Sequence, residues 1–205
     1  MFILASLYYL IWYAAVAIGA AGILLIVLRS LFLYLDVNPF TWHARQVRRA
    51  TDPVILPVRR VLVALRLDPI VAPFIVGILL VVGLLLIVQL AGNILNTVAG
   101  VLYVVAGRPQ GAPAAIIGYL LFGLLGLYTL AVFARIIFSW VGAGYGNRLA
   151  RFLIQITEPL LSPLRKWVPN VGMFDISPMI AFLILWVCQA VVASTLLKNL
   201  PVAFF

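Results

Sequence analysis

The chain has 205 residues, of which 66% are hydrophobic and 9% are charged, and its mean hydropathy is +1.22. Soluble domains are about half apolar and about a quarter charged, so a soluble fold, a disordered chain and a disulfide-rich secreted scaffold are excluded. In so apolar a chain, the net charge of +9 points to an anionic membrane surface and away from nucleic acid.

Four stretches contain no Asp, Glu, Lys or Arg, and each is long enough for the roughly 20 residues that a membrane-spanning helix needs. Backbone in lipid must satisfy its own hydrogen bonds, which favours helices. The first stretch lacks a basic start and exceeds the ~7–15 apolar residues of a signal peptide, so it is expected to be retained as a span. The predicted spans are residues 1–28, 69–107, 109–134 and 176–197.

Basic residues gather in the two segments that follow the first and the third span. These segments hold twelve of the fourteen Lys and Arg residues. Loops rich in Lys and Arg stay in the cytoplasm, so both segments are predicted to be cytoplasmic and both termini to lie outside. The basic residues are Arg29, Arg45, Arg48, Arg49, Arg59, Arg60 and Arg66, and then Arg135, Arg148, Arg151, Arg165 and Lys166.

A ten-residue motif occurs in both basic segments, at a spacing of 106 residues. It reads Thr, an acid, Pro, three residues, Pro, one residue and two bases, and it follows Arg29 and Arg135 at the same distance. Two tandem, parallel repeats are therefore predicted, 1–106 and 107–205, related by an axis along the membrane normal. The motif residues are Thr51, Asp52, Pro53, Pro57, Arg59 and Arg60, and Thr157, Glu158, Pro159, Pro163, Arg165 and Lys166.

Each repeat is expected to contain a span, an amphipathic cytoplasmic segment (38–67 or 146–168) and a second span. Arg148, Arg151 and Gln155 share one helical face, which suits a helix in the headgroup region. The motif threonines are expected to cap helices that open with the acid and the first proline, and the second proline to kink or end each helix. The segments are interpreted as membrane-surface helices, or as docking surfaces for a partner.

Arg29 and Arg135 each lie where an apolar stretch meets an aromatic-rich one. Each stands 23 residues before the acid of its motif. We therefore predict that Arg29 pairs with Asp52 and Arg135 with Glu158, which would pin each surface helix to the spans. The alternative is that each arginine extends to a lipid phosphate at the interface.

A strip of amides is expected inside the membrane. Gln89, Asn93 and Asn96 follow one face of the second span, and Gln189 lies in the fourth. Polar side chains in lipid usually face the bundle interior and bond across helices. The strip is thus either a structural hydrogen-bond network or a permeation path or ligand pocket. Its possible partners are Tyr8, Tyr9, Ser194 and Thr195.

The second half resembles the YggT family of small bacterial membrane proteins, which has relatives in chloroplasts. The likeness is carried by residues 134–140, Gly146 and Asn147, residues 155–166, and Asp175, Ile176, Ser177 and Pro178. It implies a multi-pass protein of the bacterial inner membrane. The family is linked to osmotic-stress tolerance, to membrane and nucleoid organisation and, in plastids, to cytochrome maturation. The resemblance transfers no catalytic site.

No residue set in the sequence predicts catalysis: there is no Ser/His/Asp set, no intramembrane carboxylate pair and no glycine loop for phosphate. One cysteine (Cys188) and one histidine (His43) cannot form a closed zinc site. His43 is expected to be an interfacial residue rather than a metal or haem ligand.

The expected function is a non-enzymatic organising, assembly or accessory factor that binds anionic lipid and another integral membrane protein. One alternative is a channel or transporter of small solutes or ions linked to osmotic stress. Another is a stable accessory subunit of a large energy-transducing complex. Bound lipid is expected, no other cofactor is expected from this chain, and pigment or haem would come only with a partner.

Overall fold

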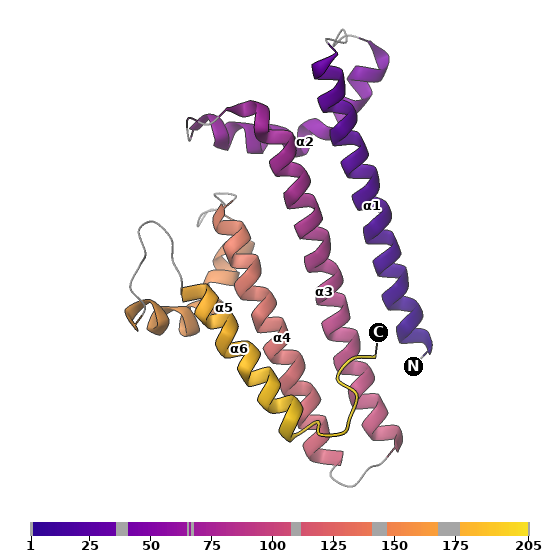
Figure 1. Cartoon of the computed structure of the whole chain (residues 1–205), viewed down its shortest axis with the longest axis vertical. Helices are drawn as coiled ribbons and strands as arrows, with labels where there is room; N and C mark the ends of the chain where they lie inside the picture. The colour runs from indigo at the N-terminus through magenta and orange to yellow at the C-terminus, as the bar shows by residue number, and fades with distance from the viewer. Residues whose placement is uncertain are drawn as a thin grey trace. The chain divides into compact units, whose positions relative to one another are not determined.

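The structure is a computed structural model that describes residues 2–35, 41–64, 66, 68–107, 112–140, 147–167 and 177–204. Every regular element in these ranges is a helix, and no strand occurs in them (Figure 1). The elements are α1 (Phe2–Tyr34), α2 (Trp42–Ala64), the 3₁₀ turn η1 (Pro69–Val71), α3 (Ala72–Gly107), α4 (Ala112–Trp140), α5 (Arg148–Trp167) and α6 (Ser177–Thr195).

Four helical stretches are long and apolar enough to cross a bilayer, which confirms the prediction of four helical spans by length and composition. Large apolar side chains point outwards from them, as in Phe74 and Trp186, which are 68% and 66% exposed. Lipid tails solvate such side chains, whereas water would not. The four stretches are Phe2–Phe32, Pro69–Gly107, Ala112–Phe138 and Ser177–Thr195.

The chain divides into two compact units. The smaller unit is Leu10–Val88, and the larger unit is Met1–Tyr9 together with Gln89–Phe205. This division falls inside α3, whereas the predicted repeat boundary lies between residues 106 and 107. The difference arises because α3 is 36 residues long, so its two ends pack with different neighbours.

In the smaller unit, α2 packs against the adjoining ends of α1 and α3. Ile55 of α2 and Val76 of α3 are buried in the same apolar cluster, and Ile26 of α1 packs against it. Further along, Gly22 of α1 faces Leu80 of α3 so closely that a methyl group at residue 22 would meet the leucine side chain at 2.6 Å. Small residues thus let these two apolar helices approach each other.

In the larger unit, α4 and α6 run side by side and α5 packs against both (Figure 1). Val132 of α4, Leu161 of α5 and Ala181 of α6 are fully buried in one cluster. Leu161 stands 106 residues after Ile55, and Val132 stands 106 residues after Ile26. Residues 106 positions apart therefore contribute to the core at both junctions, that of α2 with α1 and α3 and that of α5 with α4 and α6.

The C-terminal residues after α6 fold back onto α3 and α4. Leu197 is buried against Val104 of α3 and Tyr119 of α4. The Tyr119 hydroxyl donates to the Pro201 carbonyl oxygen at 2.7 Å. The backbone N–H of Phe204 donates to Asn96 Oδ1, also at 2.7 Å. These contacts satisfy polar groups that would be costly beside lipid.

Candidate functional site

An arginine, a threonine and an aspartate form a cluster in the smaller unit. Arg29 comes from the end of α1, and its Nη1 lies 2.6 Å from Asp52 Oδ1 of α2. The same nitrogen donates to Thr51 Oγ1 at 2.6 Å. The Arg29 side chain is 16% exposed and that of Asp52 38%. The predicted pair of Arg29 and Asp52 is therefore present, and it joins α1 to the middle of α2.

The larger unit contains the corresponding cluster. Arg135 of α4 donates through Nη1 to Thr157 Oγ1 at 2.8 Å and through Nη2 to Glu158 Oε2 at 2.7 Å. Arg165, about two turns further along α5, reaches Glu158 Oε1 at 3.2 Å. The predicted pair of Arg135 and Glu158 is thus also present. We call the two sets, Arg29–Thr51–Asp52 and Arg135–Thr157–Glu158, the Arg–Thr–acid clusters.

Each threonine is the centre of its cluster. Thr51 and Thr157 are 6% and 0% exposed. Their hydroxyls donate to the carbonyl oxygens of Val47 and Leu153, four residues earlier, at 2.7 and 2.6 Å. Each hydroxyl oxygen then accepts from the arginine, so donor and acceptor are both used. A hydrogen bond from a charged group contributes about 1.5–3 kcal/mol, whereas the more exposed ion pairs contribute about 0–1 kcal/mol.

The prediction that these threonines cap helices was wrong, because α2 and α5 each begin nine residues earlier. Asn147 caps α5: its Oδ1 accepts from the Leu149 N–H at 2.9 Å, and its carbonyl oxygen accepts from the Arg151 N–H at 3.0 Å. The carbonyl oxygen of Thr41 accepts from the Arg45 N–H in the same way. Thr41 and Asn147 are 106 residues apart, which is the signal that could have located both helix starts.

The four motif prolines lie inside α2 and α5, and neither helix ends at its second proline as one alternative had it. A proline inside a helix cannot donate to the carbonyl four residues earlier. Thr51 and Thr157, two residues before the first proline of each pair, bind both their own helix and an arginine of a neighbouring one. The clusters therefore hold α2 and α5 where their internal hydrogen bonding is weakened. The prolines are Pro53, Pro57, Pro159 and Pro163.

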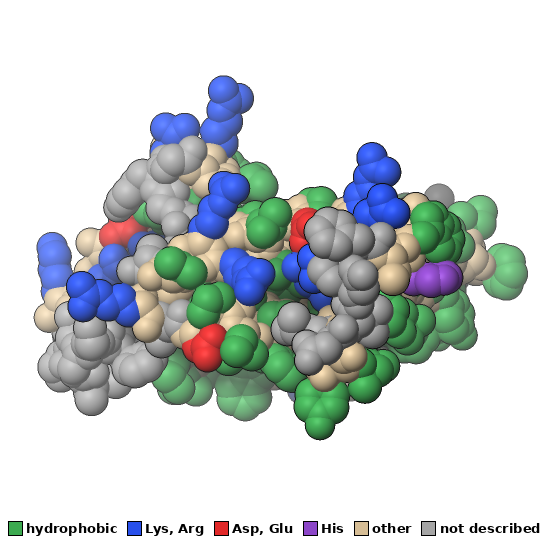
Figure 2. All heavy atoms as spheres, turned by 90° about the horizontal axis from the view of Figure 1, so that it is seen from above, with side chains coloured by type: hydrophobic (Ala, Val, Ile, Leu, Met, Phe, Trp, Pro, Cys, Tyr) green, Lys and Arg blue, Asp and Glu red, His purple; other side chains and the backbone are tan. Residues whose placement is uncertain are grey.

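The basic residues of α2 and α5 are exposed, unlike the two cluster arginines, which come from α1 and α4. Arg59 and Arg60 follow the second proline of α2, and Arg165 and Lys166 follow that of α5. Figure 2 shows protruding Lys and Arg side chains beside hydrophobic ones. Arg59 occupies the position of Arg165, but among the described residues no carboxylate lies within ion-pair distance of it. Asp52 is one methylene shorter than Glu158, so its carboxylate extends less far.

The remaining motif residues lie at the start of α6. Ser177 is fully buried and is the first residue of α6, followed by Pro178. Proline is favoured in the first turn of a helix because no partner for its N–H is needed there. Asp175 lies outside the described residues, as do Gly146 and parts of the predicted segments 38–67 and 146–168.

Three of the four strip amides take part in helix packing in the larger unit. Asn96 holds the C-terminal residues, and Gln189 Nε2 donates to the Phe122 carbonyl oxygen at 3.3 Å. Asn93 packs directly on Gly126, and a methyl group there would also meet Gln189 Nε2 at 3.2 Å. Gln89, by contrast, is exposed. This arrangement favours the structural interpretation of the strip.

The suggested partners of the strip behave differently from one another. Tyr8 packs near Gly92 of α3, one turn from the strip residue Asn96. The hydroxyls of Ser194 and Thr195 donate to the Val191 carbonyl oxygen of their own helix, at 3.1 and 2.6 Å. The Tyr9 ring lies edge-on to Tyr8, with centroids 5.7 Å apart.

Within the described ranges, no three His, Cys, Asp or Glu side chains come together in a group that could hold a metal ion. His43 lies edge-on to the Trp42 ring, with centroids 4.9 Å apart. It belongs to the first turn of α2 and is exposed. An exposed imidazole beside an indole suits the predicted interfacial position.

Comparison with known proteins points to one family. A family model described as CCB3/YggT matches residues 114–196. The protein YggT of Escherichia coli K12, itself described as uncharacterised, is 33% identical over 84 residues, which are 41% of this chain and 45% of the relative. An uncharacterised protein of Pseudomonas aeruginosa is 42% identical over 72 residues, 35% of this chain and 36% of the relative.

One relative is matched over most of its length. An uncharacterised protein of Haemophilus influenzae is 28% identical over 162 residues, 79% of this chain and 80% of the relative. The chain spans less than half of the Pseudomonas and Escherichia relatives. No solved structure matches the chain. The family match covers α4, α5 and α6 and therefore includes the Arg135–Thr157–Glu158 cluster.

Proposed function

We propose that this chain, which belongs to the YggT family, is a non-enzymatic accessory or assembly factor of the bacterial inner membrane. In this proposal it rests on anionic lipid at the cytoplasmic face and binds another integral membrane protein. The observation that carries the proposal is the pair of Arg–Thr–acid clusters. In each unit, such a cluster ties the middle of a basic helix to the end of an apolar one.

The three faces of α5 support a position in the membrane surface. One face is buried through Ala150, Thr157 and Leu161, a second exposes apolar side chains, and a third exposes polar ones. A helix in the headgroup region contacts protein, acyl chains and water at once, so it needs three such faces. The exposed apolar residues are Leu149, Phe152 and Ile156, and the polar ones are Arg148, Arg151 and Gln155.

The corresponding positions of α2 support the proposal that 1–106 and 107–205 are tandem repeats. Buried Ala44 and Ile55 in α2 stand 106 residues before buried Ala150 and Leu161 in α5. Every hydrogen bond that Thr51 makes has a counterpart at the same offset around Thr157. Two spans in each repeat return the chain to its starting side, so both basic helices are cytoplasmic and both termini outside in this proposal.

An accessory role is preferred to a channel because the amides that could line a permeation path are occupied in helix packing. Asn96 and Gln189 bond to backbone groups, and Asn93 packs on Gly126. In this proposal, the exposed surface of α2 and α5 binds the lipid and the partner protein. Partner binding and lipid binding at this surface are both proposals.

The test is photocrosslinking in the native membrane, followed by purification in mild detergent and mass spectrometry. A photoreactive residue at Phe152, which is 58% exposed on α5, is expected to capture one membrane protein in stoichiometric yield. Arg135→Gln removes the hydrogen bonds of α4 to Thr157 and Glu158 and should strongly lower the yield of the adduct. The matched variant Arg165→Gln removes the same charge from an exposed side chain and should preserve it.

Two results would contradict the proposal. One is a protein that elutes alone or as a homo-oligomer without any adduct. The other is an adduct that Arg135→Gln leaves unchanged. In the first case, solute flux through reconstituted liposomes becomes the next measurement, since it tests the channel alternative directly. Topology is tested separately by labelling a cysteine placed at Ala50, which is exposed on α2, in a Cys188→Ala background.

A further inference from the structure

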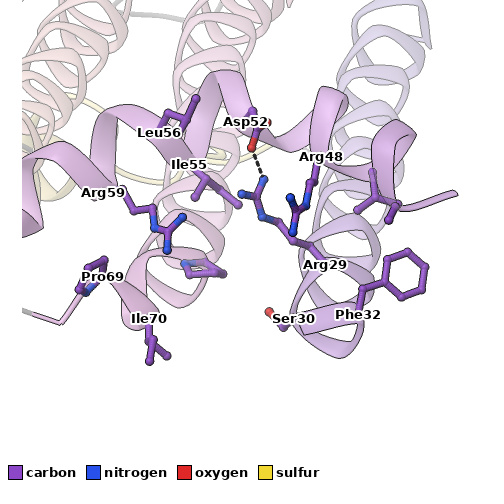
Figure 3. A pocket seen from close by; sticks show the side chains of 13 residues that line it. Arg29, Ser30, Phe32, Arg48, Asp52, Ile55, Leu56, Arg59, Pro69 and Ile70 are labelled. Atoms are coloured by element: carbon purple, nitrogen blue, oxygen red, sulfur yellow. Dashed lines mark hydrogen bonds and ion pairs between the residues drawn. The ribbon is translucent and has the colours of Figure 1, made fainter. Parts of the chain in front are cut away.

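A charged pocket lies in the smaller unit, where α2 meets the ends of α1 and α3 (Figure 3). Its volume is about 290 Å³, and three arginines and one acid line it: Arg29, Arg48, Arg59 and Asp52. Arg29 and Asp52 bond to each other. Among the described residues, no carboxylate lies within ion-pair distance of Arg48 or Arg59. The pocket therefore holds two positive charges in excess.

An apolar groove continues from this pocket. It has a volume of about 900 Å³, follows α1 and α3, and shares Ser30, Ile70 and Pro73 with the charged pocket. Ligand pockets measure about 300–1,000 Å³. The lining of α1 runs from Ile23 to Tyr34, which at 1.5 Å per residue is about 17 Å. That length is close to half of the roughly 30 Å hydrocarbon core, which is the depth of one leaflet.

The residues that create both cavities differ from those 106 positions later. Where Arg48 stands in α2, α5 has Ile154, and where Gly77 lines the groove, α6 has Leu183. Arg59 corresponds to Arg165, which is bonded to Glu158. The charges and the space are therefore properties of the smaller unit, whereas the Arg–Thr–acid cluster is common to both units.

We propose that the smaller unit binds a single anionic phospholipid, with its phosphate against Arg48 and Arg59 and one acyl chain in the groove. Guanidinium groups bind phosphate through charge-assisted hydrogen bonds. An acyl chain in the groove would extend through about one leaflet. The lipid phosphate would then lie in the charged pocket, which shares three lining residues with the groove. The inference deepens the lipid binding proposed above and rests on the placement of α2 at the membrane surface.

The experiment is native mass spectrometry of the full chain, purified in mild detergent and mixed with phosphatidylglycerol or with phosphatidylcholine of the same acyl chains. Wild type is expected to retain one phosphatidylglycerol and to bind phosphatidylcholine at least about tenfold less, a ratio that corresponds to 1.4 kcal/mol. Arg48→Gln with Arg59→Gln should lower phosphatidylglycerol binding by a similar factor. Arg49→Gln with Arg60→Gln, the matched control, removes two charges outside the pocket and should change binding less than about threefold.

The groove is tested at Gly77. A methyl group there would lie 3.9 Å from Ile26 Cδ1, so Gly77→Ala fits and should bind lipid normally. Gly77→Leu introduces the leucine found at the corresponding position of α6, Leu183. Its side chain would fill the groove, so this variant should not bind the lipid. Glycerol phosphate, which lacks acyl chains, should not displace it. The arginine variants change exposed side chains, so they test the proposal even where Gly77→Leu does not fold.

Three results would overturn the inference. One is equal loss of binding from the two double arginine variants, which would mean diffuse attraction of lipid to a basic surface. Another is displacement by glycerol phosphate together with normal binding by Gly77→Leu, which would mean a free phosphate site. The last is the absence of a stoichiometric lipid in wild type. These measurements need no protein partner, so their failure is distinct from the failure of the crosslinking experiment.

Discussion

Replacing Thr157 with valine removes one hydroxyl from the centre of the larger unit's Arg–Thr–acid cluster. Valine has nearly the same shape, so the buried position stays filled. The substitution deprives Arg135 Nη1 of its 2.8 Å acceptor while leaving the bond to Glu158 in place. A hydrogen bond to a charged group contributes about 1.5–3 kcal/mol, and interhelical bonds in membranes lie at or below the lower end. We therefore expect a loss of about 1.5 kcal/mol, roughly tenfold in the folding equilibrium.

The assay is unfolding by SDS in mixed micelles, followed by far-ultraviolet circular dichroism. Thr129→Val is the matched control, because the Thr129 hydroxyl donates to the Leu125 carbonyl of its own helix at 2.8 Å. Losing a hydrogen bond from a side chain to the backbone of its own helix changes the free energy of unfolding by about 0.5 kcal/mol or less. Equal effects of the two substitutions would refute the reasoning. So would strict additivity of Thr157→Val with Arg135→Gln, since residues in one network should couple.

Three further predictions concern other contacts of the larger unit and of α3. Arg165→Gln should cost less than about 0.5 kcal/mol in the same SDS assay, because the Arg165 side chain is 39% exposed and its bond to Glu158 is 3.2 Å long; a larger loss would place Arg165 in the structural core of the cluster. Gly100→Ala should destabilise by about 1–3 kcal/mol, because the added methyl group would meet the Tyr119 ring, whereas Gly83→Ala has open space and should be neutral or stabilising; thermal melting of both variants decides this. Asn96→Leu should release the C-terminal residues and speed amide exchange at Phe204, while Gln89→Leu, an exposed position, should not; exchange measured by mass spectrometry that stays slow in Asn96→Leu would contradict the assigned contact.

The spans and the ion pairs could be predicted because the patterns that indicate them lie along the sequence itself. Stretches without charge identify helices that lipid can solvate, and the equal offset of Arg29 from Asp52 and of Arg135 from Glu158 indicates two equivalent contacts. The hydroxyl acceptors of those arginines stood beside the acids. They were missed because a threonine before an acid and a proline also fits a helix start.

The remaining features depend on contacts between distant segments. Nothing in the sequence around Phe204 indicates that its N–H reaches Asn96, 108 residues away. Whether a proline ends a helix depends on what supports its neighbours, and here the arginines of α1 and α4 support α2 and α5. The apolar groove depends on the absence of a side chain at Gly77, which faces Ile26 of α1.

Asp52 and Glu158 differ by a single methylene group, and the arginines beside them differ in their ion pairs. The longer acid engages two guanidinium groups, Arg135 and Arg165, and so neutralises the second. Among the described residues, the shorter acid pairs with one guanidinium group, that of Arg29, and Arg59 lines the charged pocket. In the proposed lipid site, Asp52→Glu should therefore bring a carboxylate towards Arg59 and weaken phosphate binding without replacing an arginine. The length of one acidic side chain would then determine whether a nearby arginine stabilises the fold or stays available to a ligand.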